Sequence, residues 1–140
     1  MIERVVHPYQ LQKALEHVIA NKGSAGVDGV SVREIRKIFT DKKTQLVEQI
    51  KTGSYQGQPI LGITIPKGNG KTRLLGIPTT SERVLQQSVA QNIAPLFEPE
   101  FKPNSFGFRP NKNARQAVGQ AREYVHQGLN HIVDTDLKNF

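Results

Sequence analysis

The sequence has 140 residues, which suits one domain or a part of a larger protein, and its lack of cysteine excludes disulfide bonds and thiolate metal sites. Its formal net charge of +7 indicates a polyanionic partner. No apolar run approaches the roughly 18 residues of a membrane span, and the N-terminus lacks the apolar segment of a signal peptide, so neither insertion nor secretion is expected.

Two stretches without acidic residues hold much of the positive charge. They lie between Glu48 and Glu82 and between Glu100 and Glu123. Either stretch alone is as compatible with a solvated face as with a binding site, but two in one small chain favour a phosphate-binding surface. Together they contain nine basic residues, which are Lys51, Lys67, Lys71, Arg73, Lys102, Arg109, Lys112, Arg115 and Arg122.

A helix and then a glycine-rich loop are predicted near the start of the chain. Apolar residues at helical spacing predict a helix over 8–21. Gly23, Gly26 and Gly29 predict that 21–31 is a loop. Such a loop can cradle phosphate through its backbone N–H groups, but it follows a helix and lacks the lysine of a P-loop, so this signal is weak.

Two helices are predicted between this loop and the next glycine. Ser31 and Glu34 are spaced as a capping box, which predicts a short helix that ends at Ile38 or Phe39. A further helix is predicted to stop at Gly53 and to bury the apolar residues Leu46, Val47 and Ile50.

Residues 58–78 predict a β-hairpin. Two β-type runs flank the Gly-Asn-Gly at 68–70, where glycine allows the positive φ of a tight turn. Pro66 and Pro78 are expected at strand ends, because proline cannot donate a ladder hydrogen bond. Cross-strand neighbours lie about 5 Å apart, so the turn would gather three cations able to grip phosphates, Lys67, Lys71 and Arg73. Basic residues that merely protect the edges of an ordinary hairpin explain the same pattern.

The second half predicts two helices joined by an irregular loop. Thr79 and Glu82 are spaced as a capping box that opens a helix, which Pro95 should kink or end. The expected apolar stripe of this helix comprises Val84, Leu85, Val89, Ile93, Leu96 and Phe97. Prolines make 98–111 an irregular loop. A second striped helix then ends at Gly128, with Ala114, Ala117, Val118, Ala121, Tyr124 and Val125 on its apolar side.

Two further stretches could carry chemistry. Phe106 and Phe108 flank a glycine and precede Arg109, so they could stack on bases, although the favoured interpretation is that at least one of them fills a core beneath the loop. A strand is predicted over 130–136, which would put Asp134 and Asp136 on one face. Carboxylates at a strand end commonly hold Mg²⁺, and a solvent-exposed strand end is the equal alternative.

Four motifs carry a resemblance that covers residues 8–140. The first is NKGSAGVDGVSVREI, the second is IPKGNGKTRLLGIPTTSERVLQQ, the third is FEPEFKPNSFGFRPNKNARQAV and the last is VDTDLKNF. In this order they resemble the N-terminal-extension loop, the two fingers motifs and the start of the palm motif of bacterial group II intron reverse transcriptases, the intron-encoded maturases. The family often has Asp-Arg where this chain has Glu82-Arg83.

The resemblance implies an α+β fold, mainly helical, with a β-hairpin in the fingers and one C-terminal palm strand. It implies an N-terminal extension with the glycine-rich loop over 1–40, fingers over 41–128 and a truncated first palm motif over 129–140. The family's Tyr-x-Asp-Asp pair is missing from the sequence. The chain is therefore expected to be an inactive fragment, either disordered after about residue 128 or self-associating through its exposed palm-facing surface.

The resemblance also implies roles for individual residues. Asp136 would be the first catalytic, metal-binding aspartate, and the Leu137 carbonyl would be a second ligand of Mg²⁺ in the complete enzyme. Lys67, Arg73 and Arg109 would bind the incoming nucleotide. Asp134 has no clear role in the family. RNA would contact the glycine-rich loop and several residues beyond it, namely Gly23, Ser24, Ala25, Gly26, Lys71, Phe106, Lys112 and Arg115.

The implied function is that of an RNA-directed DNA polymerase, a nucleotidyltransferase that binds a template–primer duplex, a dNTP and group II intron RNA. The alternative is a non-enzymatic module that binds intron RNA and assists splicing. A bacterial cytoplasmic location without a membrane partner is expected for either.

Overall fold

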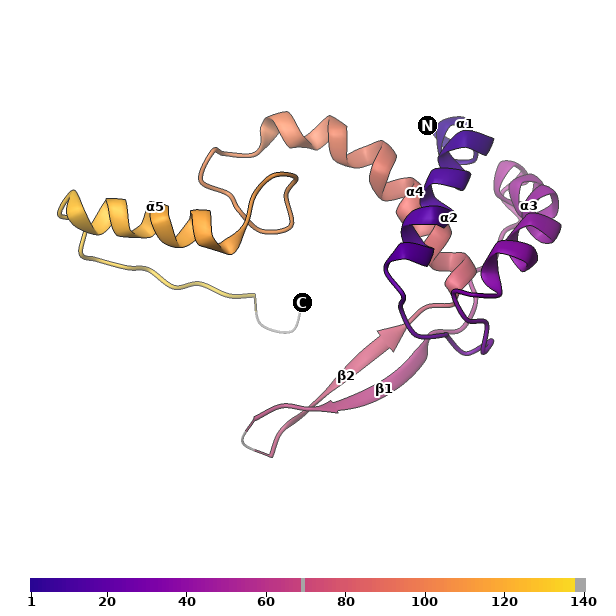
Figure 1. Cartoon of the computed structure of the whole chain (residues 1–140), viewed down its shortest axis with the longest axis horizontal. Helices are drawn as coiled ribbons and strands as arrows, with labels where there is room; N and C mark the ends of the chain where they lie inside the picture. The colour runs from indigo at the N-terminus through magenta and orange to yellow at the C-terminus, as the bar shows by residue number, and fades with distance from the viewer. Residues whose placement is uncertain (69, 138–140) are drawn as a thin grey trace. The chain divides into compact units, whose positions relative to one another are not determined.

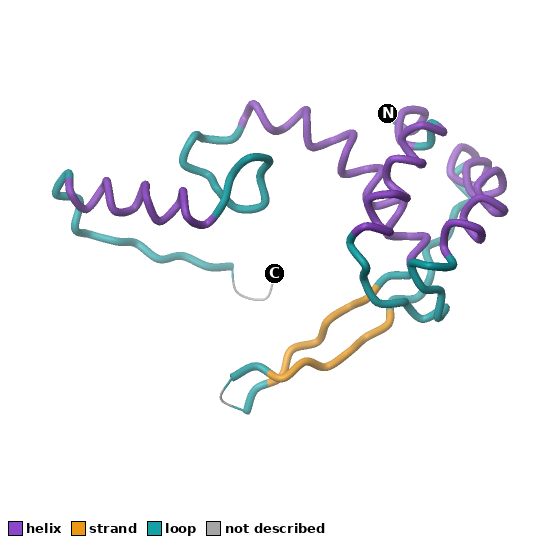
Figure 2. The backbone as a smooth tube through the Cα atoms, in the orientation of Figure 1, coloured by secondary structure: helices purple, strands orange, loops and turns teal. Residues whose placement is uncertain are grey.

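The computed structural model describes residues 1–68 and 70–137, and Figure 1 shows their course. Helices and one hairpin follow each other in the order α1, α2, α3, β1, β2, α4, a 3-10 turn and α5. The α+β, mainly helical character predicted from the sequence is confirmed (Figure 2). The chain divides into two compact units, Met1–Leu96 and Phe97–Phe140. None of the helices described is long and apolar enough to cross a membrane.

Three helices build the core of the first unit. Helix α2 (Pro8–Ala20) matches its prediction, and His7 caps it because its ring nitrogen accepts the Tyr9 N–H. Short helix α1 (Ile2–Val5) was not predicted and precedes it. The buried apolar side chains that form one cluster come from α2, α3 and the first turns of α4, and they are Leu11, Ala14, Leu15, Val18, Ile35, Phe39 and Val84. Val6, between α1 and α2, is buried as well.

Helix α3 (Ile35–Thr52) is continuous, so the prediction of two separate helices between residues 31 and 53 is wrong. The capping box predicted from Ser31 and Glu34 is only half formed. The Glu34 carboxylate accepts both the N–H and the hydroxyl of Ser31, and the helix begins at the residue after Glu34. Residues 40–45 of the helix are all polar, and they interrupt the apolar stripe without including a helix breaker. The helix ends as predicted at Gly53, whose φ is +72°.

The predicted hairpin is confirmed as β1 (Leu61–Pro66) paired antiparallel with β2 (Thr72–Ile77). Pro66 closes the first strand and Pro78 follows the second, as expected from their missing N–H groups. In Figure 1 the hairpin extends away from the helices of its unit. The predicted Gly-Asn-Gly turn includes Asn69, which lies outside the described residues.

Helix α4 (Thr80–Phe97) fully buries Val84 of the predicted apolar stripe and packs Leu85 against the core, but the rest of its buried face is polar. The buried side chains recur every fourth residue, at Thr80, Val84, Ser88 and Asn92. The polar members of this face are satisfied: the Ser88 hydroxyl donates to the Val5 carbonyl over 2.6 Å, and the Asn92 amide donates to the Ser88 carbonyl over 2.7 Å. In the expected stripe, Val89, Leu96 and Phe97 remain exposed. Pro95 lies inside the helix, which continues to Phe97.

The second unit contains a short 3-10 helix, η1 (Glu98–Glu100), an irregular loop and α5 (Ala114–His126). The loop and the helix were both predicted, and the helix is followed by Gly128 at a φ of +87°. Asn113 and Gln116 form a complete capping box at the start of α5, a signal that the sequence reasoning missed. None of the described side chains of this unit is buried.

The predicted strand over 130–136 is absent, since residues 129–137 form neither helix nor strand. Apolar residues such as Ile132 and Val133 suit a strand, but a strand also needs a neighbour for its ladder hydrogen bonds, and the described residues supply none. Without a pleat, the inference that Asp134 and Asp136 share one face also fails. The end of the palm-like motif, 138–140, lies outside the described residues.

Candidate nucleic-acid interface

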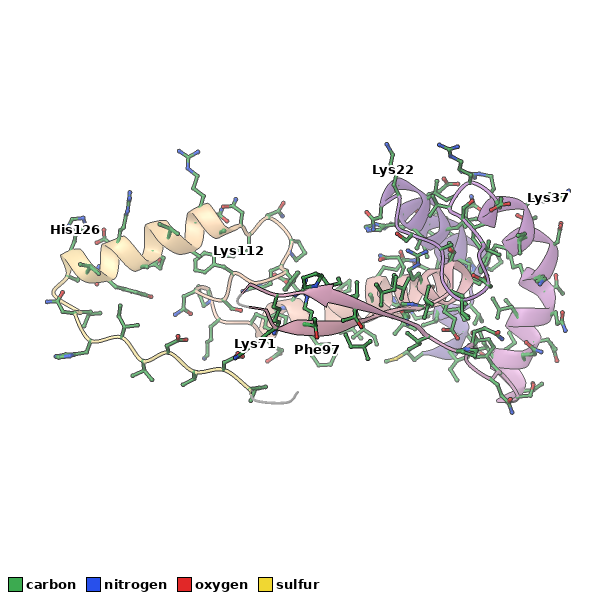
Figure 3. The ribbon with its side chains drawn as sticks, turned by 90° about the horizontal axis from the view of Figure 1, so that it is seen from below. Lys22, Lys37, Lys71, Phe97, Lys112 and His126 are labelled. Atoms are coloured by element: carbon green, nitrogen blue, oxygen red, sulfur yellow. The ribbon has the colours of Figure 1, made fainter. Side chains whose placement is uncertain are left out.

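Three cations lie on one face at the turn end of the hairpin. Arg73 pairs opposite Ile65, and the Lys67 N–H donates to the Lys71 carbonyl, which places Lys67 opposite Lys71, two pairs nearer the turn. Because strand side chains alternate, Lys67, Lys71 and Arg73 fall on the same face. Figure 3 labels Lys71 at this end of the hairpin. All three are exposed, and none takes part in either ion pair found among the described residues.

The rest of that face is apolar and partly open to solvent. It carries the directly opposed pair Ile63 and Leu75, which are 41% and 42% exposed. Leu61, Ile65 and Ile77 on the same face are half-buried. The face therefore changes along its length from an apolar base to a cationic tip, and it could contact a base or sugar at one end and phosphates at the other.

The glycine-rich loop is fastened to the start of α4 at three points. The Arg83 guanidinium donates to the Ser24 carbonyl, and the Thr80 hydroxyl donates to the Val30 carbonyl over 2.6 Å. Between these points Gly26 is buried, and a Cβ there would lie 2.7 Å from the Thr79 Cα. Gly26 is thus a packing residue, whereas Ser24 is exposed, and Gly23 and Ala25 are half-buried.

The same helix start also holds the segment that leads into the hairpin. The Glu82 carboxylate accepts the Tyr55 hydroxyl over 3.2 Å and the Gln58 N–H. Burial, followed by the nearby Glu82 charge and its hydrogen bond, raises the pKa of Tyr55 to about 12. Thr80, Glu82 and Arg83 therefore connect the glycine-rich loop and the base of the hairpin to one helical turn. The sequence signalled only the capping pattern, not these connections.

The Arg109 side chain is held by hydrogen bonds to neighbouring residues of its own segment. Its Nε and Nη2 donate to Glu98 Oε1 over 3.0 and 2.7 Å, and its Nη1 donates to the carbonyls of Lys102 and Ser105 over 2.7 and 3.0 Å. The side chain is only 10% exposed, and its guanidinium carbon lies 5.1 Å from the ring centre of Phe101. Its expected contact with a nucleotide stays a prediction that would require these bonds to rearrange.

The other candidate residues of the second unit differ in their exposure. Phe106 is half-buried, and the Lys112 ammonium lies 5.0 Å from its ring centre while donating to the Pro103 carbonyl. Figure 3 labels Lys112 just before α5. Arg115 on the first turn of α5 is exposed. Phe108 is 113% exposed, which does not fit the core-filling interpretation for this ring, although the half-burial of Phe106 does.

Asp136 is exposed, and its Oδ1 accepts the N–H of Leu137 over 2.8 Å. No group of three or more His, Cys, Asp or Glu residues that could hold a metal ion occurs in the part of the chain that the structure describes. Magnesium takes about six oxygen ligands, so Asp136 and the Leu137 carbonyl by themselves do not fit a complete magnesium site.

Comparisons with known proteins identify relatives over most of this chain. Protein YkfC of Escherichia coli is 31% identical over 120 residues, which are 84% of this chain and 32% of that protein. The group II intron-encoded protein LtrA of Lactococcus lactis is 32% identical over an alignment of 133 residues that covers 89% of this chain and 21% of LtrA. The putative COX1/OXI3 intron 2 protein of Saccharomyces cerevisiae is 28% identical over 119 residues, or 84% of this chain and 13% of that protein.

No protein-family profile matches the sequence. The chain spans about a third or less of the length of the curated relatives named above. Each alignment covers more than four fifths of this chain, and two of the three names refer to introns. The chain therefore belongs to the family of group II intron-encoded proteins of the reverse transcriptase and maturase type, and it corresponds to part of the length of the relatives named here.

Proposed function

We propose that this chain is the part of an RNA-directed DNA polymerase that binds template RNA and the incoming dNTP. The cationic tip of the hairpin is the observation that carries the proposal, because Lys67, Lys71 and Arg73 are exposed, share a face and lack acidic partners among the described residues. Arg73 would grip a phosphate bidentately and the two lysines would act as point charges. The glycine-rich loop would cover the template strand.

Asp136 would contribute one carboxylate ligand to Mg²⁺, and the remaining ligands would come from other parts of the complete polymerase. Bound Mg²⁺ would neutralise charge that develops on the transferred phosphate. The chain by itself should therefore give no primer extension. Incorporation of dNTPs by the 140-residue chain, abolished by Asp136→Asn, would refute this expectation.

A second candidate function is a non-enzymatic module that binds intron RNA and assists splicing. Asp136 belongs to no group of three or more metal-ligating residues in the described part of the chain, which suits this alternative, since RNA binding needs only the basic surfaces and no complete metal site. Both candidates require RNA binding by the hairpin, so the same experiment tests what they share.

The test measures binding of a labelled RNA template–primer duplex by fluorescence anisotropy. The double variant Lys67→Gln/Arg73→Gln should bind several-fold more weakly than the unmodified chain at about 0.1 M salt, because it loses two phosphate contacts. The control is Lys13→Gln/Lys37→Gln, which removes the same charge from exposed positions on α2 and α3. Equal weakening by both double variants would mean that only net charge matters and would reject the hairpin as the site.

A further inference from the structure

The loop between η1 and α5 holds one phenylalanine ring out in solvent. The Phe108 side chain is 113% exposed, as open as in an unfolded peptide, and its backbone has a φ of +54°. The left-handed region is unfavourable for a bulky residue, so this geometry persists only where the surrounding structure enforces it.

Arg109, the next residue, provides that enforcement. Its guanidinium joins the Glu98 carboxylate at one end of the loop to the carbonyls of Lys102 and Ser105 in the middle. Because Arg109 is nearly buried, with 10% of its side chain exposed, the backbone that carries Phe108 is anchored immediately beside the ring. Asn111, also at a positive φ of 59°, turns the chain again before α5.

The stretch of sequence that carries this ring is basic. The sequence contains no acid from residue 101 to residue 122, and Lys102 and Arg115 are exposed there. An accessible aromatic ring within a basic stretch of chain matches the chemistry of a single nucleic-acid strand, which offers unstacked bases and phosphates together. Phe106 does not match it equally well, because that ring is half-buried beneath the Lys112 ammonium.

We propose that Phe108 is a stacking platform for one unpaired base of an RNA strand and that Arg109 positions it. This inference rests on the proposed RNA-binding function and makes it more specific. It moves the base contact from Phe106 to Phe108, and it gives Arg109 a positioning role within the protein instead of a contact with the incoming nucleotide.

The sequence contains no tryptophan, so Phe108→Trp introduces a single fluorescent probe at the platform. A short single-stranded RNA should quench its emission, while a strand of the same length without bases and a blunt RNA duplex should not, even at saturation. Phe97→Trp is the matched control, because Phe97 is also exposed, at 56%, and it should respond to none of the three. In the Phe108→Trp protein, Arg109→Lys should reduce the quenching at saturating RNA without changing the affinity for the base-free strand.

Affinity provides the second measurement. Phe108→Leu keeps an apolar side chain but removes the π-face, and it should weaken binding of the single strand by about tenfold. Its affinity for the base-free strand and its salt dependence should not change, and Phe97→Leu should bind like the unmodified chain. Equal quenching by the base-free strand, quenching that depends on protein concentration without RNA, or an unchanged affinity of Phe108→Leu would each overturn the inference while leaving RNA binding intact. Failure of the unmodified chain to bind any RNA would reject the inference together with the proposed function.

Discussion

The tightest approach in the glycine-rich loop occurs at Gly26. A Cβ at this position would lie 2.7 Å from the Thr79 Cα and 2.8 Å from the Pro78 carbonyl oxygen, so backbone would have to move. We expect Gly26→Ala to lower the free energy of unfolding by about 1–3 kcal/mol, as overpacking does. Urea unfolding measures this change. Gly68→Ala is the control, because nothing lies within 4 Å of a Cβ there, and equal effects of the two substitutions would contradict the packing role.

Replacing Arg109 should loosen its loop locally, because the contact with Glu98 depends on the shape of the guanidinium group. Lysine is a point charge with three donors and cannot reproduce the fork that reaches both Glu98 and two carbonyls. Arg109→Lys should therefore speed hydrogen exchange of the Ser105 and Lys112 amides, both of which donate within the loop. Arg115→Lys, at an exposed position, should leave these rates unchanged. Slow exchange retained in Arg109→Lys would show that the loop does not depend on the guanidinium.

At the scale of elements, the start of α4 connects two segments that the proposed function uses. Thr80 and Arg83 hold the glycine-rich loop, and Glu82 holds the lead-in to β1 through Tyr55 and Gln58. A ligand that displaces the glycine-rich loop would therefore disturb the helical turn that also holds the lead-in to β1, and the reverse is also true. This coupling needs no contact between the loop and the hairpin tip.

The hydrogen bond between Tyr55 and Glu82 can be observed through the raised pKa of the Tyr55 phenol. Its value of about 12 lies above the ordinary tyrosine value of about 10, so folding favours the neutral phenol. The stability that Tyr55 contributes is complete below about pH 10 and is lost as the pH rises through about 12. An ultraviolet titration should show a late phenol component, which Tyr55→Phe removes and Tyr9→Phe retains. Persistence of the late component in Tyr55→Phe would contradict the assignment.

Much of the element order could be predicted from the sequence, because apolar spacing, glycine stops and the turn around 68–70 are local signals. Helix α3 was divided wrongly because the polar stretch 40–45 resembled a break. Part of the buried face of α4 was missed because Ser88 and Asn92 are polar, and only their hydrogen-bond partners explain their burial. The absent strand over 130–136 depends on pairing that the described part of the chain cannot supply.

The candidate site was predictable to a different degree at each position. The cations of the hairpin could be inferred because strand register follows from the turn, and the structure brings them to one face. The ion pair between Arg109 and Glu98 could not be inferred, since a salt bridge within an irregular segment leaves no periodic signal in the sequence. Nothing in the spacing of Phe106 and Phe108 distinguished the covered ring from the open one.

For the whole molecule, the second unit presents apolar side chains without burying any that the structure describes. Val118 and Val125 on α5 and Ile132 and Val133 beyond it are all more than half exposed. We therefore expect the 140-residue chain to associate reversibly, because monomeric proteins rarely leave such a surface uncovered. Sedimentation velocity across a dilution series should show a concentration-dependent increase in mass, and Val118→Lys/Val125→Lys should reduce it. A monomer at every concentration would contradict this expectation.

If the cationic tip of the hairpin binds RNA phosphates, the affinity for RNA should depend on salt through Lys67, Lys71 and Arg73. We would plot log K against log salt for an RNA duplex with the unmodified chain and with the triple variant Lys67→Gln/Lys71→Gln/Arg73→Gln. Each lost phosphate contact lowers the slope by roughly 0.7–0.9, the range for nucleic-acid strands, so we expect the triple variant to lose about 2–3 units of slope. An unchanged slope would mean that these three residues do not contact phosphates and would contradict the account.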